Sequence, residues 1–523
     1  MPKSLDSITD SFTDTRSHYL AAKRSSRLRR RRQGIPPMGA SADWHYQSEG
    51  DYLWMAEAAR DMDRNDLVIG QAVDRVVENT VQSGFCPEPR TGDEGLNKAL
   101  KERWEDESTD PQLCDVAGQL TFHEQTKLVL RDCLVAGDIF ALPSREGPVQ
   151  LVEGHRCRSP HRSKKNIVHG VEMTENRKRL RYWFTKEPIN PLAANGLRLK
   201  DLRSIEAYDS SGRPNVWHVY FPKRATQTRG VSALAPCFDA ASMHDDIQFA
   251  ELLHRQVASC FFIFRNRTSE WDPTLNNNAA RIGNELPADG TQRRIEGVVP
   301  GLELTGAKGE TLTMDSPNIP NQTYFPHVRM VLTFISINLG LPLVVFLMDA
   351  SETNFSGYRG AIDQARIGFR NIQGKLVEKW CRPNWWWKVE RWAEDDPAMA
   401  KALADGSLWK HTWHKPNFAY IEPVKDATAD LIRQSNLLIS PSRWAAERGH
   451  DWNELVNETI RDRRQAIEQA LEVAGELNQA HGLAGEASVR WRDLAPLPNA
   501  DGVAVSIIDG PNGTTTNEEK ASA

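Results

Sequence analysis

Apolar side chains recur every three to four residues in several long stretches, which predicts a mainly helical chain. The first stretch begins at Asp51 and is stopped by Gly84, with apolar positions at Leu67, Ile69, Ala72, Val73, Val76, Val77 and Val81. Further helical patterns run from Asp115 to Ala136, from Phe238 to Phe261, from Tyr324 to Leu339, from Ile362 to Trp380, and from Lys425 to Glu476 as two or three short helices.

Shorter alternating runs predict strands between the helical stretches. DIFALPSR, at Asp138–Arg145, and several runs between Gln150 and Pro222 have this pattern. An aromatic-rich block follows the helix that ends at Trp380, and its HTWH segment, His411–His414, is strand-like. The three tryptophans Trp385–Trp387 fit a core or a subunit interface better than a base-stacking surface. The fold class is therefore α+β and predominantly helical.

The composition is that of a soluble globular chain, with 523 residues, 40% hydrophobic and 26% charged. This length predicts two to four domains. The formal charge of −5 argues against a chain held to nucleic acid by bulk positive charge, although residues 1–45 form a basic arm with an arginine run. The 7 scattered cysteines include no CxxC pair and suggest reduced thiols, and MPKSLDSITDSF lacks the apolar core of a secretory signal.

One uncharged segment, Met330–Met348, has nearly the length of a membrane span. Asn338, Gly340 and Pro342 interrupt it, so we expect a buried helix end followed by a short strand or turn.

No motif with catalytic or cofactor chemistry is complete. GLELTGAKGET lacks the Gly-Lys-Ser/Thr of a phosphate loop, since Ala307 precedes Lys308 and Gly309 follows it. His155, Cys157 and His161 would need a fourth metal ligand, and the two histidines of HTWH would face opposite sides of a strand. We therefore predict no catalytic residue, no metal and no cofactor, and a chain that is not an enzyme.

The stretch NFSGYRGAIDQARIGFRNIQGKLVEKW, Asn354–Trp380, combines a polar loop with a helix that carries two faces. Its apolar face consists of Ile362, Ala365, Phe369, Ile372, Leu376 and Trp380. Arg359, Arg366 and Arg370 form a column beside it, because their offsets nearly complete whole turns. The alternative is an ordinary solvated helix surface. The glycines Gly357, Gly360, Gly368 and Gly374 weaken the helix, which favours support from an oligomer.

The order of the motifs resembles the lambda-type portal proteins of tailed bacteriophages. GASADW is followed by AARDMDRNDLVIGQAVDRVVENTVQSGF, LVEGHRCRSP, IVHGVEMTENRKRLRYWF and the Gln-x-Arg-Gly-Val segment at Gln227–Val231. PGLELTGAKGETL, INLGLP with NFSGYRGAI, IEPVKDATAD and ISPSRWAAERGHDWNELVNE complete the series. The chain departs from the family pattern at Phe355, where tyrosine is usual, and at Gly357, where serine is usual.

The resemblance implies a homo-oligomeric ring, normally of about twelve copies, at one capsid vertex of the virion. Its implied partners are double-stranded DNA without sequence specificity, the large terminase subunit, head-tail connector or neck proteins, and the major capsid and scaffold proteins. Assembly would take place in the host bacterial cytoplasm and not in a membrane. The regions implied are an arm (1–45), wing (46–233), first stem helix (234–265), clip (266–322), second stem helix (323–340), tunnel loop with long helix and return to the wing (341–424), crown (425–482) and mostly disordered tail (483–523).

The tunnel loop of the family would correspond to Asp349–Tyr358. The residues expected to line a DNA channel are Asn354, Ser356, Tyr358, Arg359, Arg366, Arg370 and Lys375. Those expected on a clip that faces terminase or connector proteins are Arg281, Arg293 and Arg294.

A mildly acidic chain with thin basic rings suits a channel, because a strongly basic lining would bind DNA tightly and stall its movement. The rival interpretations are a packaging enzyme of the terminase type, for which no nucleotide loop is found, and another virion structural protein.

Overall fold

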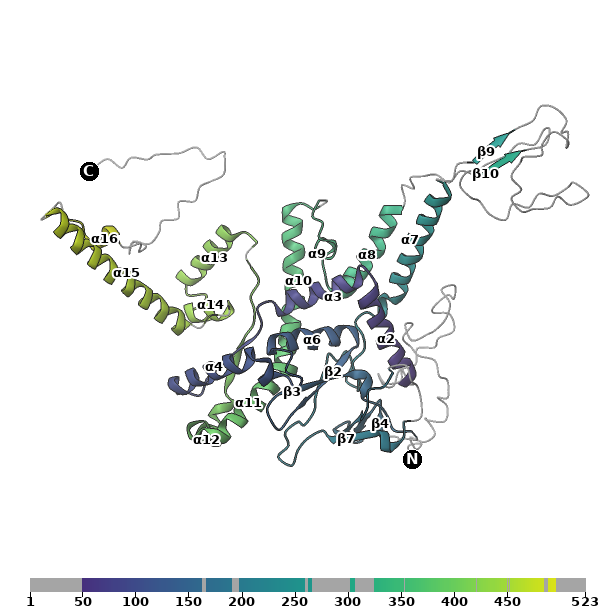
Figure 1. Cartoon of the computed structure of the whole chain (residues 1–523), viewed down its shortest axis with the longest axis horizontal. Helices are drawn as coiled ribbons and strands as arrows, with labels where there is room; N and C mark the ends of the chain where they lie inside the picture. The colour runs from purple at the N-terminus through teal and green to yellow at the C-terminus, as the bar shows by residue number, and fades with distance from the viewer. Residues whose placement is uncertain are drawn as a thin grey trace, which may run out of the picture. The chain divides into compact units, whose positions relative to one another are not determined.

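The computed structural model describes residues 49–161, 166–190, 197–258, 262–265, 302–305, 324–351, 353–419, 421–448, 450, 452–483 and 488–494. The chain divides into two compact units, the first ending at Phe418 and the second beginning at Ala419. Figure 1 shows the helices and strands of both units.

The described part of the first unit opens with five helices. They are α2 (Glu49–Asn65), α3 (Ile69–Val81), α4 (Glu94–Thr109), α5 (Pro111–Cys114) and α6 (Phe122–Val135). The predicted continuous helix from Asp51 is wrong at Leu67, which is 88% exposed in the break between α2 and α3. The Asp66 carboxylate accepts from the backbone N–H groups of Val68 and Ile69 at 2.8 and 2.9 Å, which starts a new helix there.

The start predicted for the next helix, at Asp115, is also wrong. The helix α6 begins only at Phe122, because Thr121 and Glu124 form a capping box that satisfies the first free N–H groups.

Antiparallel strands follow α6 and form two small sheets, as the alternating pattern predicted. One has the order β3-β2-β8, from Val149–Glu153, Asp138–Pro143 and Trp217–Tyr220. The other has the order β4-β5-β6-β7, from Ile167–Val168, Val171–Met173, Arg179–Thr185 and Leu202–Glu206. A separate pair joins β1 (Cys86–Pro89) to β11, which is the predicted strand His411–His414.

Two helices, α7 (Phe238–Ala258) and α8 (Tyr324–Leu339), pack against each other. The helix predicted to reach Arg265 is wrong at its end, because Phe262–Arg265 forms strand β9 in parallel with β10 (Leu302–Thr305). After Pro342 the chain forms the short helix α9 (Leu343–Leu347), so the strand or turn expected there is wrong. No described helix is both long and apolar enough to cross a membrane.

The long helix α10 (Phe355–Leu376) continues through a π-helical turn (Val377–Cys381) into α11 (Arg382–Asp395), and α12 (Pro397–Ala404) follows after a break at Asp396. The tryptophan run lies on α11, where Trp385 is fully buried and Trp386 is 38% exposed. The expected core role is confirmed for Trp385. It lies with Trp380 and Trp392 in the main core, to which α3, α6, β2 and β8 also contribute.

The second unit is helical, as predicted, with α13 (Pro423–Ser435), α14 (Pro441–Glu447), α15 (Trp452–His481) and the short α16 (Trp491–Leu494). The longest helix runs to His481, beyond the predicted end at Glu476.

Candidate functional site

The arginine of the Gln-x-Arg-Gly-Val segment lies in the interior of the first unit. Arg229 is 0% exposed, and its guanidinium forms an ion pair with the carboxylate of Asp138 on β2. Its Nε donates to Asp138 Oδ2 at 2.5 Å, and its Nη2 donates to Asp138 Oδ1 at 3.0 Å. This two-pronged geometry is the strongest form of an arginine–carboxylate pair.

The remaining hydrogen bonds of Arg229 go to backbone carbonyl groups. Its Nη1 donates to Cys157 at 3.2 Å and to His169 at 2.8 Å, and its Nη2 donates to Gly154 at 2.7 Å. The rings of Tyr52 and Phe140 lie 4.9 and 5.0 Å from the guanidinium carbon. All its N–H groups donate hydrogen bonds within the first unit, so the role of this arginine is to hold several chain segments together.

Asp138 is the centre of this arrangement and accepts hydrogen bonds from three segments of the chain. It accepts from the Tyr52 hydroxyl at 3.0 Å, from His218 Nε2 at 2.8 Å and from the Gly230 N–H at 3.2 Å. Burial alone would raise the pKa of Asp138, but the Arg229 charge and the His218 hydrogen bond outweigh burial and hold that pKa far below its ordinary value. We call Arg229, Asp138, His218 and Tyr52 the Arg229 clasp.

The glycine that follows Arg229 is required by close backbone packing. A Cβ atom on Gly230 would overlap the carbonyl group of Gly137. The Gln227 side chain donates to the Arg229 carbonyl at 2.8 Å and accepts from the Lys223 N–H at 2.9 Å. The Gln227–Val231 segment, which resembles the portal motif, is therefore buried, and its contacts hold the strands of the first unit in place.

The polar loop predicted to extend to Tyr358 ends earlier, at the N-cap of α10. The Asn354 side chain accepts from the Gly357 N–H at 2.7 Å, so the helix begins at Phe355. Ser356 is exposed in the first turn, whereas Tyr358 and Arg359 are half-buried. The predicted loop boundary is wrong because this cap brings four more residues into the helix.

The apolar face predicted for α10 is confirmed. Ala365, Phe369 and Leu376 are buried, and Phe369 lies 6.1 Å from Phe418 between ring centroids. The face also contains a buried polar residue that sequence reasoning missed. Gln373 is 1% exposed and donates to the carbonyl groups of Thr80 and Pro416 at 3.0 and 3.2 Å. A glutamine four residues after Phe369 on an apolar face was the available signal.

The basic residues of α10 lie along one helix but differ in surroundings. Arg366 is 3.5 Å from Asp363 and lies 5.2 Å from the ring of Phe418, which Arg370 approaches at 5.7 Å. Arg370 is exposed, and the ammonium group of Lys375 lies 5.5 Å from the ring of Phe221. In all three residues the charged group itself lies over an aromatic ring, at the distance of a cation–π contact.

Apolar side chains are exposed just before α10. Met348 has a left-handed backbone, with φ of 56°, and is 74% exposed, while Leu347 is 37% exposed. Phe355 in the first turn of α10 is 53% exposed. The Ser351 N–H donates to Asp349 at 2.9 Å and lowers the pKa of that carboxyl. The segment before the arginine column therefore presents apolar and acidic groups.

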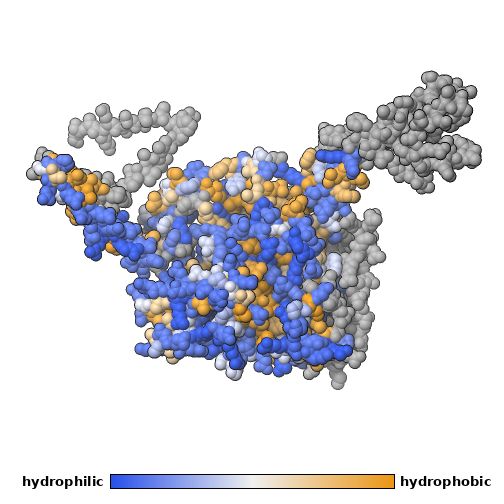
Figure 2. Space-filling view, in the orientation of Figure 1, coloured by the Kyte–Doolittle hydropathy of each residue, from blue (hydrophilic) through white to orange (hydrophobic). Residues whose placement is uncertain are grey.

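Helices α7 and α8 carry a second group of exposed apolar side chains, which the packing of the two helices against each other does not bury. Its members are Phe249 (69% exposed), Leu252 (68%), Leu253 (49%), Met330 (46%), Phe334 (60%) and Ile337 (67%). Figure 2 shows apolar groups gathered on the part of the first unit where α7, α8 and α9 lie. We call these six residues the stem stripe.

The structure gives no support to the weak metal motif. His155 Nδ1 lies 2.9 Å from Glu153, and Cys157 is buried with its thiol directed to the His169 carbonyl at 3.7 Å. No cluster of three or more candidate metal ligands occurs among the residues that the structure describes. Arg281, Arg293 and Arg294 lie outside those residues, as does the phosphate-loop-like segment after Thr305.

Comparisons with solved structures find matching chains at low sequence identity. A chain in "Virion of native gene transfer agent (GTA) particle" is 11% identical, with a TM-score of 0.41, over 74% of this chain and 91% of that one. A chain in "Neck of native GTA particle computed with C12 symmetry" is 11% identical, with a TM-score of 0.38, over 75% and 93%. A third, in "Neck of empty GTA particle computed with C6 symmetry", is 10% identical, with a TM-score of 0.42, over 75% and 94%.

No curated protein matches the chain. The family model described as "Phage portal protein, lambda family" matches residues 29–373, which include α2 to α9, the Arg229 clasp and most of α10. The match covers well over half of the sequence, so this chain belongs to the lambda family of phage portal proteins.

Proposed function

We propose that the chain is the subunit of a closed portal ring through which double-stranded DNA enters and leaves a virion. Membership of the portal family supports this role in general terms. The observation that carries the proposal is the stem stripe, an apolar surface that the protomer leaves open to water.

Burying the stem stripe against another copy would be strongly favourable. A fully buried aromatic or aliphatic side chain contributes about 1.5–3 kcal/mol relative to exposure, and each copy supplies six partly exposed ones. A contact between two different surfaces of neighbouring copies closes into a ring when the rotation between them is a whole fraction of a turn. Such an arrangement covers the stripe on every copy.

The α10 helix would then border the channel. Its basic residues, Arg359, Arg366, Arg370 and Lys375, would meet the phosphate backbone, while Asn354, Ser356 and Tyr358 would lie at its leading end. Arginine, lysine, serine and tyrosine side chains offer contact with phosphates and no base readout, so the interaction would be independent of DNA sequence. The weak, repeated charge suits DNA that must slide.

The remaining parts of the proposal concern partners. The segment between β9 and β10, with Arg281, Arg293 and Arg294, would meet the large terminase subunit during packaging and head-tail connector proteins afterwards. Capsid and scaffold proteins would surround the ring at its vertex, and assembly would take place in the bacterial cytoplasm. The portal would act as a passive conduit and a docking site, with nucleotide hydrolysis performed by the terminase.

The ring can be tested by native mass spectrometry of the purified chain together with negative-stain images. We expect closed rings of about twelve copies with a central hole. Monomers under every assembly condition would contradict the proposal. Hydrolysis of ATP by the purified chain would instead favour a packaging enzyme, and solubility only in detergent would favour a membrane role.

Paired substitutions test whether the stem stripe makes the contact. Phe249→Ser with Phe334→Ser should shift the chain from rings to monomers, because both side chains would lose their burial between copies. Leu180→Ser is the matched control, since Leu180 is 41% exposed on β6 and lies outside the stripe. Rings that persist in the double variant, with the fold intact by circular dichroism, would assign the contact to another surface.

A further inference from the structure

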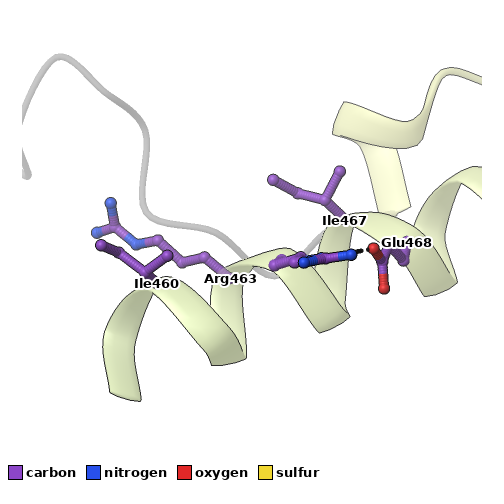
Figure 3. Close-up of a pocket in the computed structure, with 5 residues that line it drawn as sticks. Ile460, Arg463, Ile467 and Glu468 are labelled. Carbon is purple, nitrogen blue, oxygen red and sulfur yellow. Dashed lines mark hydrogen bonds and ion pairs between the residues drawn. The ribbon is translucent and has the colours of Figure 1, made fainter. Parts of the chain in front are cut away.

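The helix α15 of the second unit carries an open hollow along one of its faces. Ile460, Arg463, Arg464, Ile467 and Glu468 line a hollow of about 450 Å³, and Figure 3 shows these side chains along the helix. Ile460 is 59% exposed, and Leu471, one turn beyond Ile467, is 52% exposed. A single helix with apolar groups facing solvent needs another element against it.

The spacing of these residues is that of a coiled-coil seam. Ile460, Arg464, Ile467 and Leu471 follow each other at intervals of four, three and four residues, which are the d, a, d and a positions of a heptad. In this register Arg463 is a g position and Glu468 is an e position. In a parallel pair, a knob from one helix enters a hole made by four residues of the other, and Ile460, Arg463, Arg464 and Ile467 form such a hole.

Among the residues that the structure describes, the chain covers only the later part of this seam. Ala474, the next d position, is 5% exposed, and Asn478, the next a position, exchanges hydrogen bonds with the Val489 backbone at 2.9 and 2.8 Å. The part from Ile460 to Leu471 stays open on the described surface. The occupant must therefore match about two heptads of helix.

We propose that the occupant is α15 of a second copy, aligned in parallel, so that the second units associate in pairs. Charge complementarity supports the parallel alignment, because a g residue meets the e residue five positions later on its partner. Arg463 would meet Glu468 of the other copy in this way. Arg463 makes no ion pair within the described part of the chain, whereas Glu468 is held by Arg464 Nε at 2.8 Å.

This inference rests on the proposed ring in one respect. A seam of about two heptads with an arginine at one a position is too short to associate strongly in isolation. Holding the copies in a ring would raise their effective concentration and make the weak contact form. Rotation about a ring axis leaves neighbouring copies pointing the same way; for the same seam to meet on both copies, the two second units must also turn toward each other.

Disulfide cross-linking of the full-length chain tests the pairing. All variants carry Cys86→Ser and Cys260→Ser, since Cys86 is an exposed thiol and Cys260 lies outside the described residues. With Ile467→Cys, oxidation by copper-phenanthroline should give covalent dimers and nothing larger, because each α15 offers one such seam. Asp462→Cys is the matched control, exposed on the opposite side of the same helix, and should stay monomeric under the same oxidation.

Other results would overturn the pairing. A ladder of higher oligomers from Ile467→Cys would mean contact with both neighbours, and cross-linking only between Ile460→Cys and Leu471→Cys would mean antiparallel helices. No cross-link at all would also overturn it, and native mass spectrometry of the same sample separates the two claims. If rings are present, only the seam is wrong; if they are absent, the proposed function fails with it.

A charge exchange tests the alignment in a second way. Adding Arg463→Glu to the Ile467→Cys chain should lower the dimer yield by about threefold, the effect of losing an exposed ion pair. Adding Glu468→Arg to that variant should restore the yield, because the pair between copies then forms with its charges reversed. An unchanged yield in both variants would overturn the proposed parallel contact between Arg463 and Glu468.

Discussion

Arginines occupy two contrasting environments in the first unit. Arg229 is enclosed, with its guanidinium bonded to Asp138 and to three backbone carbonyl groups. On α10, Arg370 is exposed and touches only the ring of Phe418 among the contacts that the structure describes. The two arginines therefore do different things: Arg229 holds strands together, and Arg370 leaves its charge exposed to solvent.

The difference lies in what surrounds each guanidinium. A buried charge is tolerated only when it is paired and fully hydrogen-bonded, so the Arg229 clasp depends on every one of its members. An exposed arginine beside an aromatic ring contributes little to stability and can exchange partners freely. We therefore expect the clasp to control folding and the α10 residues to control what the assembled protein contacts.

The largest effect should come from removing the buried arginine. Arg229→Met leaves the Asp138 carboxylate buried without its counter-charge and should lower the free energy of unfolding by about 3–5 kcal/mol. Urea denaturation followed by circular dichroism measures this. The matched change Arg370→Met should alter stability by less than about 0.5 kcal/mol. Similar losses in both variants would remove the distinction between the two arginines.

A pair of glycine substitutions gives a second comparison with effects of opposite sign. Gly230→Ala places a methyl group against the Gly137 backbone and should cost about 1–3 kcal/mol. Gly360→Ala on α10 meets nothing within 4 Å and should stabilise the helix by up to about 1 kcal/mol. Thermal unfolding of the two variants checks both signs. Stabilisation by Gly230→Ala would contradict the close backbone packing.

The pH dependence of stability should also depend on the clasp. Burial and the nearby Arg179 charge lower the pKa of His218 from 6.5 to about 3, so the folded protein keeps this ring neutral. The unfolded chain takes up the proton below pH 6.5, so the stabilising contribution is present above that pH and is lost as the pH falls towards 3.

Between about pH 5.5 and 4, the free energy of unfolding should therefore fall less steeply in His218→Gln than in the parent chain. The slope should be smaller by roughly 1.4 kcal/mol per pH unit. Urea titrations at several pH values measure the slope. An exposed histidine replaced in the same way, His161→Gln, should leave the slope nearly unchanged. An unaltered slope in His218→Gln would show that this ring is not kept neutral in the folded state.

Substitutions in the arginine column should have the smallest effect on stability but a large effect on DNA packaging or retention. Changing Arg359, Arg366 and Arg370 together to glutamine should leave rings intact while altering DNA packaging or retention, because up to three phosphate contacts per copy are removed. Particle assays at several salt concentrations measure retention. Failure of the rings to form would make the column a contact between subunits.

Much of the first unit could be predicted from residue pattern alone. The periodic apolar face of α10 and the short strands between Gln150 and Pro222 follow from burial on one side. Two of the errors fall where a local cap overrides the pattern, as Asp66 does before α3 and Asn354 does before α10. Caps depend on one or two local hydrogen bonds, which periodicity does not reveal.

The candidate site was predictable only in part. Arg359, Arg366 and Arg370 could be placed on one helix, because their spacing fixes their angular positions. Their different exposure could not be predicted, since it depends on Phe418, distant in sequence. The Arg229 clasp could not be predicted either, because Asp138 lies 91 residues before Arg229 and only the folded sheets bring the two residues together.

A cryo-EM map of the assembled particle tests the central claim most directly. The account predicts a closed ring in which the stem stripe of α7 and α8 is covered by neighbouring copies and the α10 arginines lie near the axis, with the Arg229 clasp buried inside each copy. A ring in which the stem stripe stays open to solvent and α10 faces away from the axis would contradict it.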